Sequence, residues 1–149
     1  MILRPAGPAD VGGIADIDIA ARAAALPNVR WAHTPAEVRG WMAETLLATR
    51  DVWVAEQDGL LGFMALQPGW IDQLYLRPGF WRRGIGSALM ARAKALHPTG
   101  LHLYCFQCNA RARAFYEAQG FTAESFTDGA GNEEQEPDIL YAWAGAAIQ

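Results

Sequence analysis

The sequence has only two cysteines, and their spacing limits what they can do. Cys105 and Cys108 form a C-x-x-C pair inside residues 101–108, a run typical of a strand. Three strand steps would separate the two thiols by about 10 Å, which is beyond disulfide reach. A zinc site would need a second pair of ligands at matching spacing. We therefore expect two free structural thiols and no metal.

Long hydrophobic segments are missing as well. No stretch approaches the roughly 18 consecutive apolar residues of a membrane-spanning helix. Asp10, Asp16 and Asp18 interrupt the N-terminal region before it could act as a secretion signal. The 149 residues, 52% of them hydrophobic, fit one domain with its own core. We expect a single domain over residues 1–149, cytoplasmic and with no membrane partner.

Charges of one sign are missing from two long segments. Residues 77–113 contain seven basic residues and no acid, whereas residues 114–149 contain seven acids and neither lysine nor arginine. The net charge of −4 argues against nucleic acid as a partner. The first segment suggests an anion site and the second a region that attracts cations. Two solvated surfaces of different charge would give the same pattern.

Apolar spacing and turn residues predict one mixed α/β arrangement. Strands are expected at 2–4, 52–56, 60–67, 70–76, 101–107, 121–127 and 138–144, and helices at 8–25, 35–48, from the glycine loop to before Pro98, and 109–119. Thr34 and Glu37 form a capping box for the second helix. Along the strand 70–76, alternation places Trp70, Asp72, Leu74 and Leu76 on one face and Ile71, Gln73 and Tyr75 on the other.

A glycine loop, Arg82-Arg83-Gly84-Ile85-Gly86-Ser87, joins a predicted strand to a predicted helix. Glycines at 84 and 86 let the backbone approach a ligand closely, and the unpaired N–H groups of the helix favour an anion. Tight strand–helix turns also use glycine with no ligand. A dinucleotide fingerprint would need glycine where Leu89 stands, and the Walker pattern is absent.

Two motifs in the right order and spacing resemble those of the GNAT superfamily of acetyl-CoA-dependent N-acyltransferases. The first runs from Ile71-Asp72-Gln73-Leu74-Tyr75-Leu76-Arg77-Pro78 into residues 82–89, and the second comprises Asn109, Ala112, Ala114, Phe115-Tyr116-Glu117 and Gly120-Phe121. The resemblance covers essentially the whole chain. Two positions depart from the family. Trp81 stands where the signature Arg/Gln-x-x-Gly-x-Gly/Ala begins, and Trp70 stands where several members carry a glutamate base.

The resemblance implies an α/β domain with a twisted, mostly antiparallel mixed sheet, four flanking helices, and fourth and fifth strands that splay apart to admit acetyl-CoA. It also implies a set of residues for that co-substrate. The backbone of Leu74, Tyr75 and Leu76 would bind the pantetheine arm, Arg82, Arg83, Gly84, Ile85, Gly86 and Ser87 the pyrophosphate, and Asn109 and Phe115 further parts of the molecule. Tyr116 would contact it and protonate the leaving thiolate.

The expected reaction is direct attack of a primary amine on the thioester in a ternary complex. An alkylammonium with a pKa of about 10.4 must first lose a proton, which costs about 4.6 kcal/mol at pH 7. A carboxylate can take that proton, and Asp72 is the candidate base because it stands near the missing glutamate. A hydrogen-bonded strand acid is the alternative for Asp72.

The acidic C-terminal segment predicts a small cationic amine as the acceptor. Glu133 and Glu134, in the final hairpin loop, and His33, before the second helix, are candidate substrate-binding residues. Solvent-exposed loop residues without a function are the alternative for all three.

Two function classes compete at this stage. A non-catalytic acyl-CoA-binding sensor or interaction module would explain the missing base and Trp81. An enzyme explains why Asn109 and Tyr116 are both present. We predict the enzyme, an acetyl-CoA-dependent N-acetyltransferase without a metal. Six tryptophans in a small domain are compatible with a homodimer.

Overall fold

A computed structural model describes residues 1–146. Seven strands form one sheet in the order β1-β2-β3-β4-β5-β7-β6. Their bounds are β1 Ile2–Pro5, β2 Asp51–Glu56, β3 Leu60–Gln67, β4 Trp70–Leu76, β5 Leu101–Phe106, β6 Thr122–Phe126 and β7 Asp138–Trp143. Every neighbouring pair is antiparallel except β4 and β5, which are parallel. The mixed, mostly antiparallel sheet predicted from the sequence is confirmed.

Four helical segments flank the sheet. They are α1 Val11–Ala25, a segment of α2 Pro35–Trp41 continued by a π-helical turn Met42–Leu46 and α3 Leu47–Thr49, then α4 Ile85–Leu96 and α5 Ala110–Ala118. The capping box is present, since Thr34 Oγ1 accepts from the N–H of Glu37 at 3.2 Å and Glu37 Oε1 accepts from the N–H of Thr34 at 2.9 Å. None of the helices within residues 1–146 combines the length and hydrophobicity needed to cross a bilayer.

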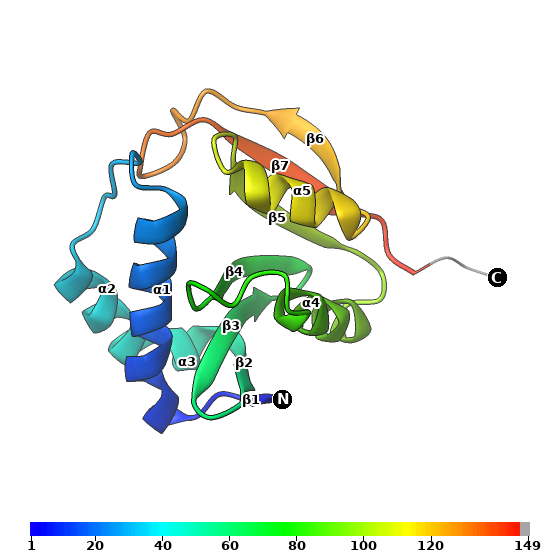
Figure 1. Cartoon of the computed structure of the whole chain (residues 1–149). Coiled ribbons are helices and arrows are strands. Elements are labelled where there is room, and N and C mark those ends of the chain that lie inside the picture. The colour runs from blue at the N-terminus through cyan, green and yellow to red at the C-terminus, as the bar shows by residue number, and fades with distance from the viewer. Residues whose placement is uncertain (147–149) are drawn as a thin grey trace.

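The core has two layers, one on each face of the sheet (Figure 1). On one face, α1 and the segment 35–49 pack on β2 and β3 through Ile14, Met42, Leu46 and Phe63. On the other face, α4 and α5 cover the sheet, with Leu89 and Met90 of α4 fully buried. Cys105 is buried in this second layer and Cys108 is exposed, both as free thiols, as the sequence predicted.

The parallel strands β4 and β5 separate along their length. They share one register pair in the described structure, Trp70 with His102, and the N–H of His102 donates to the carbonyl of Gly69 at 2.9 Å. Beyond that point the two strands diverge, and a gap between their ribbons opens toward the loop before α4 and toward α5 (Figure 1). The predicted splay is confirmed.

A β-bulge in β4 overturns the predicted alternation of its side chains. Gln73 pairs with Ala65 of β3, but the next β3 residue pairs with Ile71, so Asp72 is an extra residue. An extra residue shifts the alternation by one position. Ile71 therefore shares the α4 face with Leu74 and Leu76, and the expectation that it faces the other way is wrong.

Candidate active site

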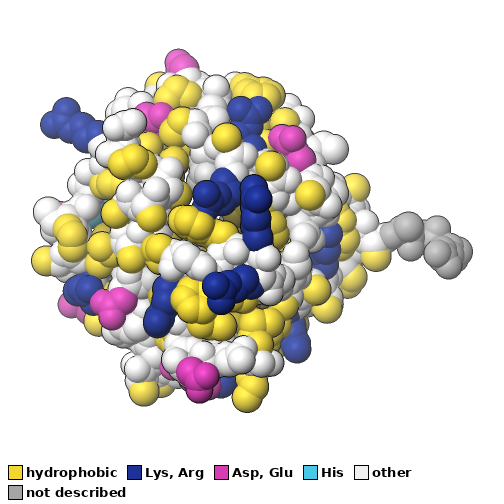
Figure 2. Space-filling model, in the orientation of Figure 1, with side chains coloured by type: hydrophobic (Ala, Val, Ile, Leu, Met, Phe, Trp, Pro, Cys, Tyr) yellow, Lys and Arg dark blue, Asp and Glu magenta, His cyan; other side chains and the backbone are white. Residues whose placement is uncertain are grey.

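A cleft of about 1070 Å³ fills the space that the splayed strands leave open. Figure 2 shows it as a hollow with hydrophobic side chains inside and Lys and Arg side chains around it. The predicted site residues that line it are Asp72, Leu74, Tyr75, Leu76, Arg82, Gly84, Gly86, Ser87, Asn109, Phe115, Tyr116 and Glu134. Arg83, Ile85, His33 and Glu133 are not among its lining residues. The two sequence motifs thus meet at a single cavity.

The wall of the cleft formed by β4 presents backbone groups that can still form hydrogen bonds. From Asp72 onward, the edge of β4 that faces β5 has no strand partner in the described structure. Backbone N–H and C=O groups in that position need partners, and an extended ligand can supply them as an added strand would. The side-chain oxygen Oε1 of Gln73, on the same strand, is buried and has no hydrogen-bond partner within residues 1–146. The wall therefore suits a ligand that carries amide groups.

The two glycines of the glycine loop are needed for different structural reasons. Gly84 has a φ of 81°, a left-handed conformation that glycine adopts without strain, and α4 starts directly after it. A Cβ atom at Gly86 would lie 3.2 Å from Cε1 of Phe115. Gly86 thus allows α4 to lie close to α5, a packing role that the sequence alone did not indicate. Ile85 is buried in the core beneath the loop.

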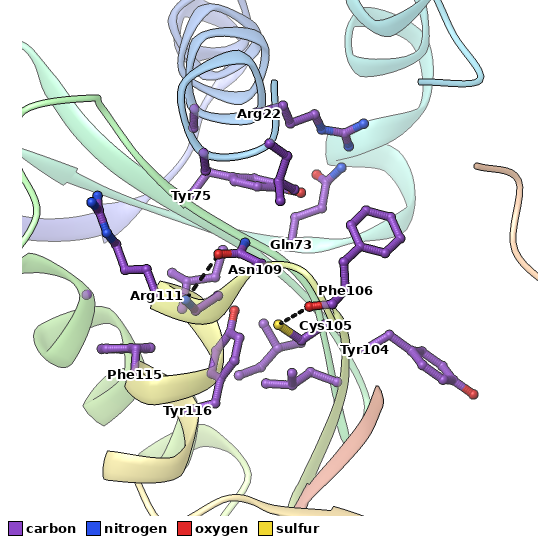
Figure 3. Close-up of a pocket in the computed structure, with 18 of the residues that line it drawn as sticks. Arg22, Gln73, Tyr75, Tyr104, Cys105, Phe106, Asn109, Arg111, Phe115 and Tyr116 are labelled. Atoms are coloured by element: carbon purple, nitrogen blue, oxygen red, sulfur yellow. Dashed lines mark hydrogen bonds between the residues drawn. The ribbon is translucent and has the colours of Figure 1, made fainter. Parts of the chain in front are cut away.

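Asn109 begins α5 and holds its first turn. Its side-chain Oδ1 accepts a hydrogen bond from the N–H of Ala112 at 3.2 Å, which makes it the helix N-cap (Figure 3). The same side chain lines the cleft. Asn109 therefore has a structural reason to be asparagine in addition to the predicted contact with a ligand.

Tyr116 extends from α5 into the pocket (Figure 3). Its ring packs on Phe115 and Phe121, with ring centroids 5.4 Å and 5.9 Å away. Burial raises the pKa of Tyr116 well above its ordinary value, and nearby Cys105 and Tyr75 add to the rise. Within residues 1–146 no hydrogen bond engages its hydroxyl. At neutral pH this group carries a proton, and its O–H is available to donate a hydrogen bond.

A polar group that the sequence analysis missed lies on the α1 side of the cleft. Arg22 donates from Nε to Oδ1 of Asp18 at 2.6 Å, and Asp18 is fully buried. The guanidinium lies 4.6 Å from the ring centroid of Trp31 and 5.5 Å from that of Tyr75. Burial raises the pKa of Asp18, while Arg22 opposes that rise. Asp18 and Arg22 are four residues apart on the predicted helix, and this spacing was the available signal.

The predicted base, Asp72, has a partner. Its Oδ2 accepts a hydrogen bond from Nε of Arg50 at 2.9 Å, next to the bulge in β4. Glu134 also lines the cleft, on the loop between β6 and β7, and its carboxylate has no hydrogen bond or ion pair within the part of the chain that the structure describes. Asp138, at the start of β7, also lines the cleft and accepts hydrogen bonds from Thr127 and Asn132. Of these three carboxylates, Glu134 alone has no partner among the described residues.

His33 and Glu133, predicted separately, contact one another. Nε2 of His33 lies 2.7 Å from Oε2 of Glu133, which joins the loop after α1 to the loop before β7. Glu37 adds a second carboxylate 3.7 Å from Nδ1. The hydrogen bond to Glu133 and its charge raise the pKa of His33 above its ordinary value. Both side chains are more than half exposed, so the contact lies at the surface beside the cleft.

The arginines of the glycine loop take different positions. Arg82 lines the cleft and has a φ of 63°. The guanidinium of Arg83 lies 5.0 Å from the ring centroid of Phe80, outside the cleft lining. Arg111 of α5 also lines the cleft, and the sequence analysis did not single it out.

Comparisons with known proteins agree with the geometry. Residues 48–123 match the family described as the acetyltransferase (GNAT) domain. The chain is 35% identical over 127 residues to the peptidyl-lysine N-acetyltransferase YiaC of Escherichia coli, a match that covers 79% of this chain and 84% of that protein. It is 32% identical over 104 residues to the peptidyl-lysine N-acetyltransferase YjaB of Salmonella typhimurium, covering 67% of this chain and 71% of that protein.

Solved structures share the fold. The apo form of YjaB from Escherichia coli superposes with a TM-score of 0.80 at 21% identity, and the match covers 98% of this chain and 100% of that one. The PaiA N-acetyltransferase of Thermoplasma acidophilum, solved in complex with coenzyme A, has a TM-score of 0.76 at 19% identity. That match covers 96% of this chain and 98% of that one.

Proposed function

The chain belongs to the GNAT family of acetyltransferases, and from that premise we propose that it acetylates a cationic primary amine in the cleft between β4 and β5. Membership makes the chain an acetyl-CoA-dependent acyltransferase, and the non-catalytic sensor is set aside. The observation that carries the proposal is the protonated phenol of Tyr116 in an apolar cleft, beside a β4 edge. Neither the phenol nor that edge has a hydrogen-bond partner in the part of the chain that the structure describes.

Acetyl-CoA fits the groups around the cleft. The free edge of β4 at Leu74–Leu76 suits the amides of the pantetheine arm, and the buried Oε1 of Gln73 still needs a donor. The first N–H groups of α4, behind Gly84, favour the pyrophosphate. Phe115 supplies apolar surface on the opposite wall. When bound, acetyl-CoA supplies an activated thioester to the attacking amine.

Tyr116 acts on the leaving sulfur. A phenol whose pKa lies above the value of about 8.5 for a thiol gives up its proton to a thiolate only uphill. Tyr116 therefore first donates a hydrogen bond as negative charge develops on the sulfur. Complete transfer of its proton yields the free thiol and a tyrosinate, which regains a proton from solvent. Its low-polarity surroundings strengthen that hydrogen bond.

A carboxylate must take the proton that the ammonium loses. We propose Asp72 for this step, with Glu134 as the second candidate. Arg50 engages the carboxylate of Asp72, whereas Glu134 has no hydrogen bond or ion pair among the described residues. The variants Asp72→Asn and Glu134→Gln distinguish the two candidates. Removing the residue that acts as the base should shift the plateau of kcat/KM to higher pH, because the amine must then lose its proton without help.

The acceptor is inferred from charge and from the relatives. Glu134 in the cleft and Glu133 beside it favour a cationic amine. The relatives YiaC and YjaB are named peptidyl-lysine N-acetyltransferases, and a lysine side chain carries an alkylammonium of the same kind. Small polyamines and lysine-containing peptides are therefore the two acceptor types to test first.

The test follows thiol release from acetyl-CoA against polyamines, free amino acids, aminoglycosides, lysine peptides and peptide N-termini. Calorimetric titration with acetyl-CoA alone runs beside it. We expect binding of acetyl-CoA and turnover with at least one cationic amine, with a higher KM in Glu134→Gln. Binding without turnover on the whole panel would contradict the proposed acceptor class, and no binding at all would contradict the proposed site.

A further inference from the structure

Arg111 is stacked on Trp81, the residue that directly precedes the glycine loop. Its guanidinium carbon is 3.7 Å from the ring centroid of Trp81, the shortest contact of this kind within residues 1–146. Both residues line the cleft, Arg111 from the first turn of α5 and Trp81 from the segment between β4 and α4. The side chain of Arg111 reaches away from Tyr116, toward the other end of the pocket (Figure 3).

The stacking leaves the hydrogen-bonding edge of Arg111 free. A guanidinium stacks through its flat face, while its N–H groups point outward in its plane. Among the described residues, Arg111 makes no ion pair or side-chain hydrogen bond, and the segment 77–113 around it contains no acid. A charged planar group held flat, with unused donors, is suited to bind a phosphate through two parallel hydrogen bonds.

The surroundings of Arg111 carry further positive charge that favours an anion such as a phosphate. Gly84, Gly86 and Ser87 bring the N-terminus of α4 to the same cleft, and that end of a helix carries partial positive charge. Arg82 adds a second cation to the cleft lining. Trp81 itself stands where the family signature begins with arginine or glutamine. Arg111 therefore brings a cation from α5 to position 81, where the loop has tryptophan.

We propose that Arg111, held on Trp81, binds a phosphate group of acetyl-CoA and supplies from α5 the charge that the glycine loop lacks at position 81. This inference rests on the proposed function, since it assumes that acetyl-CoA occupies the cleft. Trp81 acts as a positioning residue that fixes the plane of the guanidinium. Arg111 makes the contact.

The test is calorimetric titration of acetyl-CoA into Arg111→Gln. Loss of a charge-assisted hydrogen bond predicts a Kd raised about 10- to 100-fold. Acetylpantetheine, which has the thioester but no phosphate, should bind the variant and the unsubstituted chain alike. Arg92→Gln is the matched control, because Arg92 stacks on Trp53 at 4.7 Å and lies outside the cleft lining. It removes the same charge and should leave Kd unchanged.

Trp81 is tested by two substitutions. Trp81→Ala should raise the Kd of acetyl-CoA about 3- to 10-fold by releasing the guanidinium, and Trp81→Phe should recover most of the affinity. Dephospho-CoA, which lacks the 3′-phosphate, identifies the group bound. If Arg111→Gln weakens dephospho-CoA as much as CoA, the contact is to the pyrophosphate, and if only CoA is weakened, it is to the 3′-phosphate.

Three results would overturn the inference. They are an effect of Arg111→Gln no larger than that of Arg92→Gln, an equal loss of affinity for acetylpantetheine, or no change in Trp81→Ala. Failure of the unsubstituted chain to bind acetyl-CoA would instead overturn the proposed function, so the two failures are distinguishable.

Discussion

Two tyrosines on the same side of the sheet have different chemical freedom. The rings of Tyr116 and Tyr141 are 6.2 Å apart. Tyr141 is fully buried, and its hydroxyl donates to Oε2 of Glu117 at 2.6 Å. The hydroxyl of Tyr116 has no such bond among the described residues and opens on the cleft. The environment, and not the residue type, makes Tyr116 the candidate proton donor.

Tyr116→Phe should lower kcat about 100-fold, because it removes a donor aimed at the leaving sulfur. The Kd of acetyl-CoA should stay within twofold, since the ring and its packing remain. Stopped-flow thiol release and calorimetry measure the two quantities. In the matched variant Tyr141→Phe, loss of the bond to Glu117 should lower the free energy of unfolding by about 1 kcal/mol and leave kcat nearly unchanged. Equal kcat losses in the two variants would refute the role of Tyr116.

At the scale of elements, the cleft depends on how α4 and α5 are spaced. Gly86 is the point at which the helices approach, because a Cβ there would meet the ring of Phe115 at 3.2 Å. The bulge at Asp72 has a comparable effect within β4, since it directs Leu74 and Leu76 toward the α4 layer. The absence of a Cβ atom at Gly86 and the extra residue Asp72 in β4 therefore both shape the walls of the cleft.

Gly86→Val should force α5 away from α4. Overpacking of this kind predicts a free energy of unfolding lower by about 1–3 kcal/mol and a weaker affinity for acetyl-CoA. Ala91→Val is the control, because Ala91 is exposed on the same helix and bears only the propensity cost of a β-branched residue, about 0.5 kcal/mol. Urea denaturation compares them, and equal losses would show that the contact with Phe115 is unimportant.

At the scale of the whole molecule, one surface contact connects the two halves of the chain. His33 and Glu133 are 100 positions apart, and their side chains meet at 2.7 Å. Glu37 faces the same imidazole, so the charged form of His33 has two acidic neighbours. Because the pKa of His33 is raised in the folded state, protonation and folding favour one another.

The stabilisation from His33 should therefore depend on pH with a definite sign. It is fully present below the unfolded pKa of about 6.5 and is lost as pH rises through the higher folded value. The Tm difference between the unsubstituted chain and His33→Gln should be larger at about pH 6 than at about pH 8.5. Glu133→Gln should remove most of that pH dependence. A Tm difference that is constant with pH, or that grows as pH rises, would contradict the pairing.

The sequence alone determined the elements and the main motifs. These are local signals, each contained in a short stretch of sequence: the spacing of apolar residues, the capping box at Thr34 and the positions of the glycines. They predicted the strands, the helices and the segments 74–76 and 82–87, most of whose residues line the cleft. The acetyltransferase family followed from the same two motifs.

Only the tertiary structure decided which side chains meet. The bulge at Asp72 arises from its register with β3, and the contacts of Arg111 with Trp81 and of His33 with Glu133 join separate elements. Arg50 reaches Asp72 across 22 positions. No local pattern encodes such pairs, because they depend on how sheet order and helix packing bring distant segments together. Local sequence preferences thus determined the strands, helices and loops that form the site. Long-range packing determined which of their side chains contact one another there.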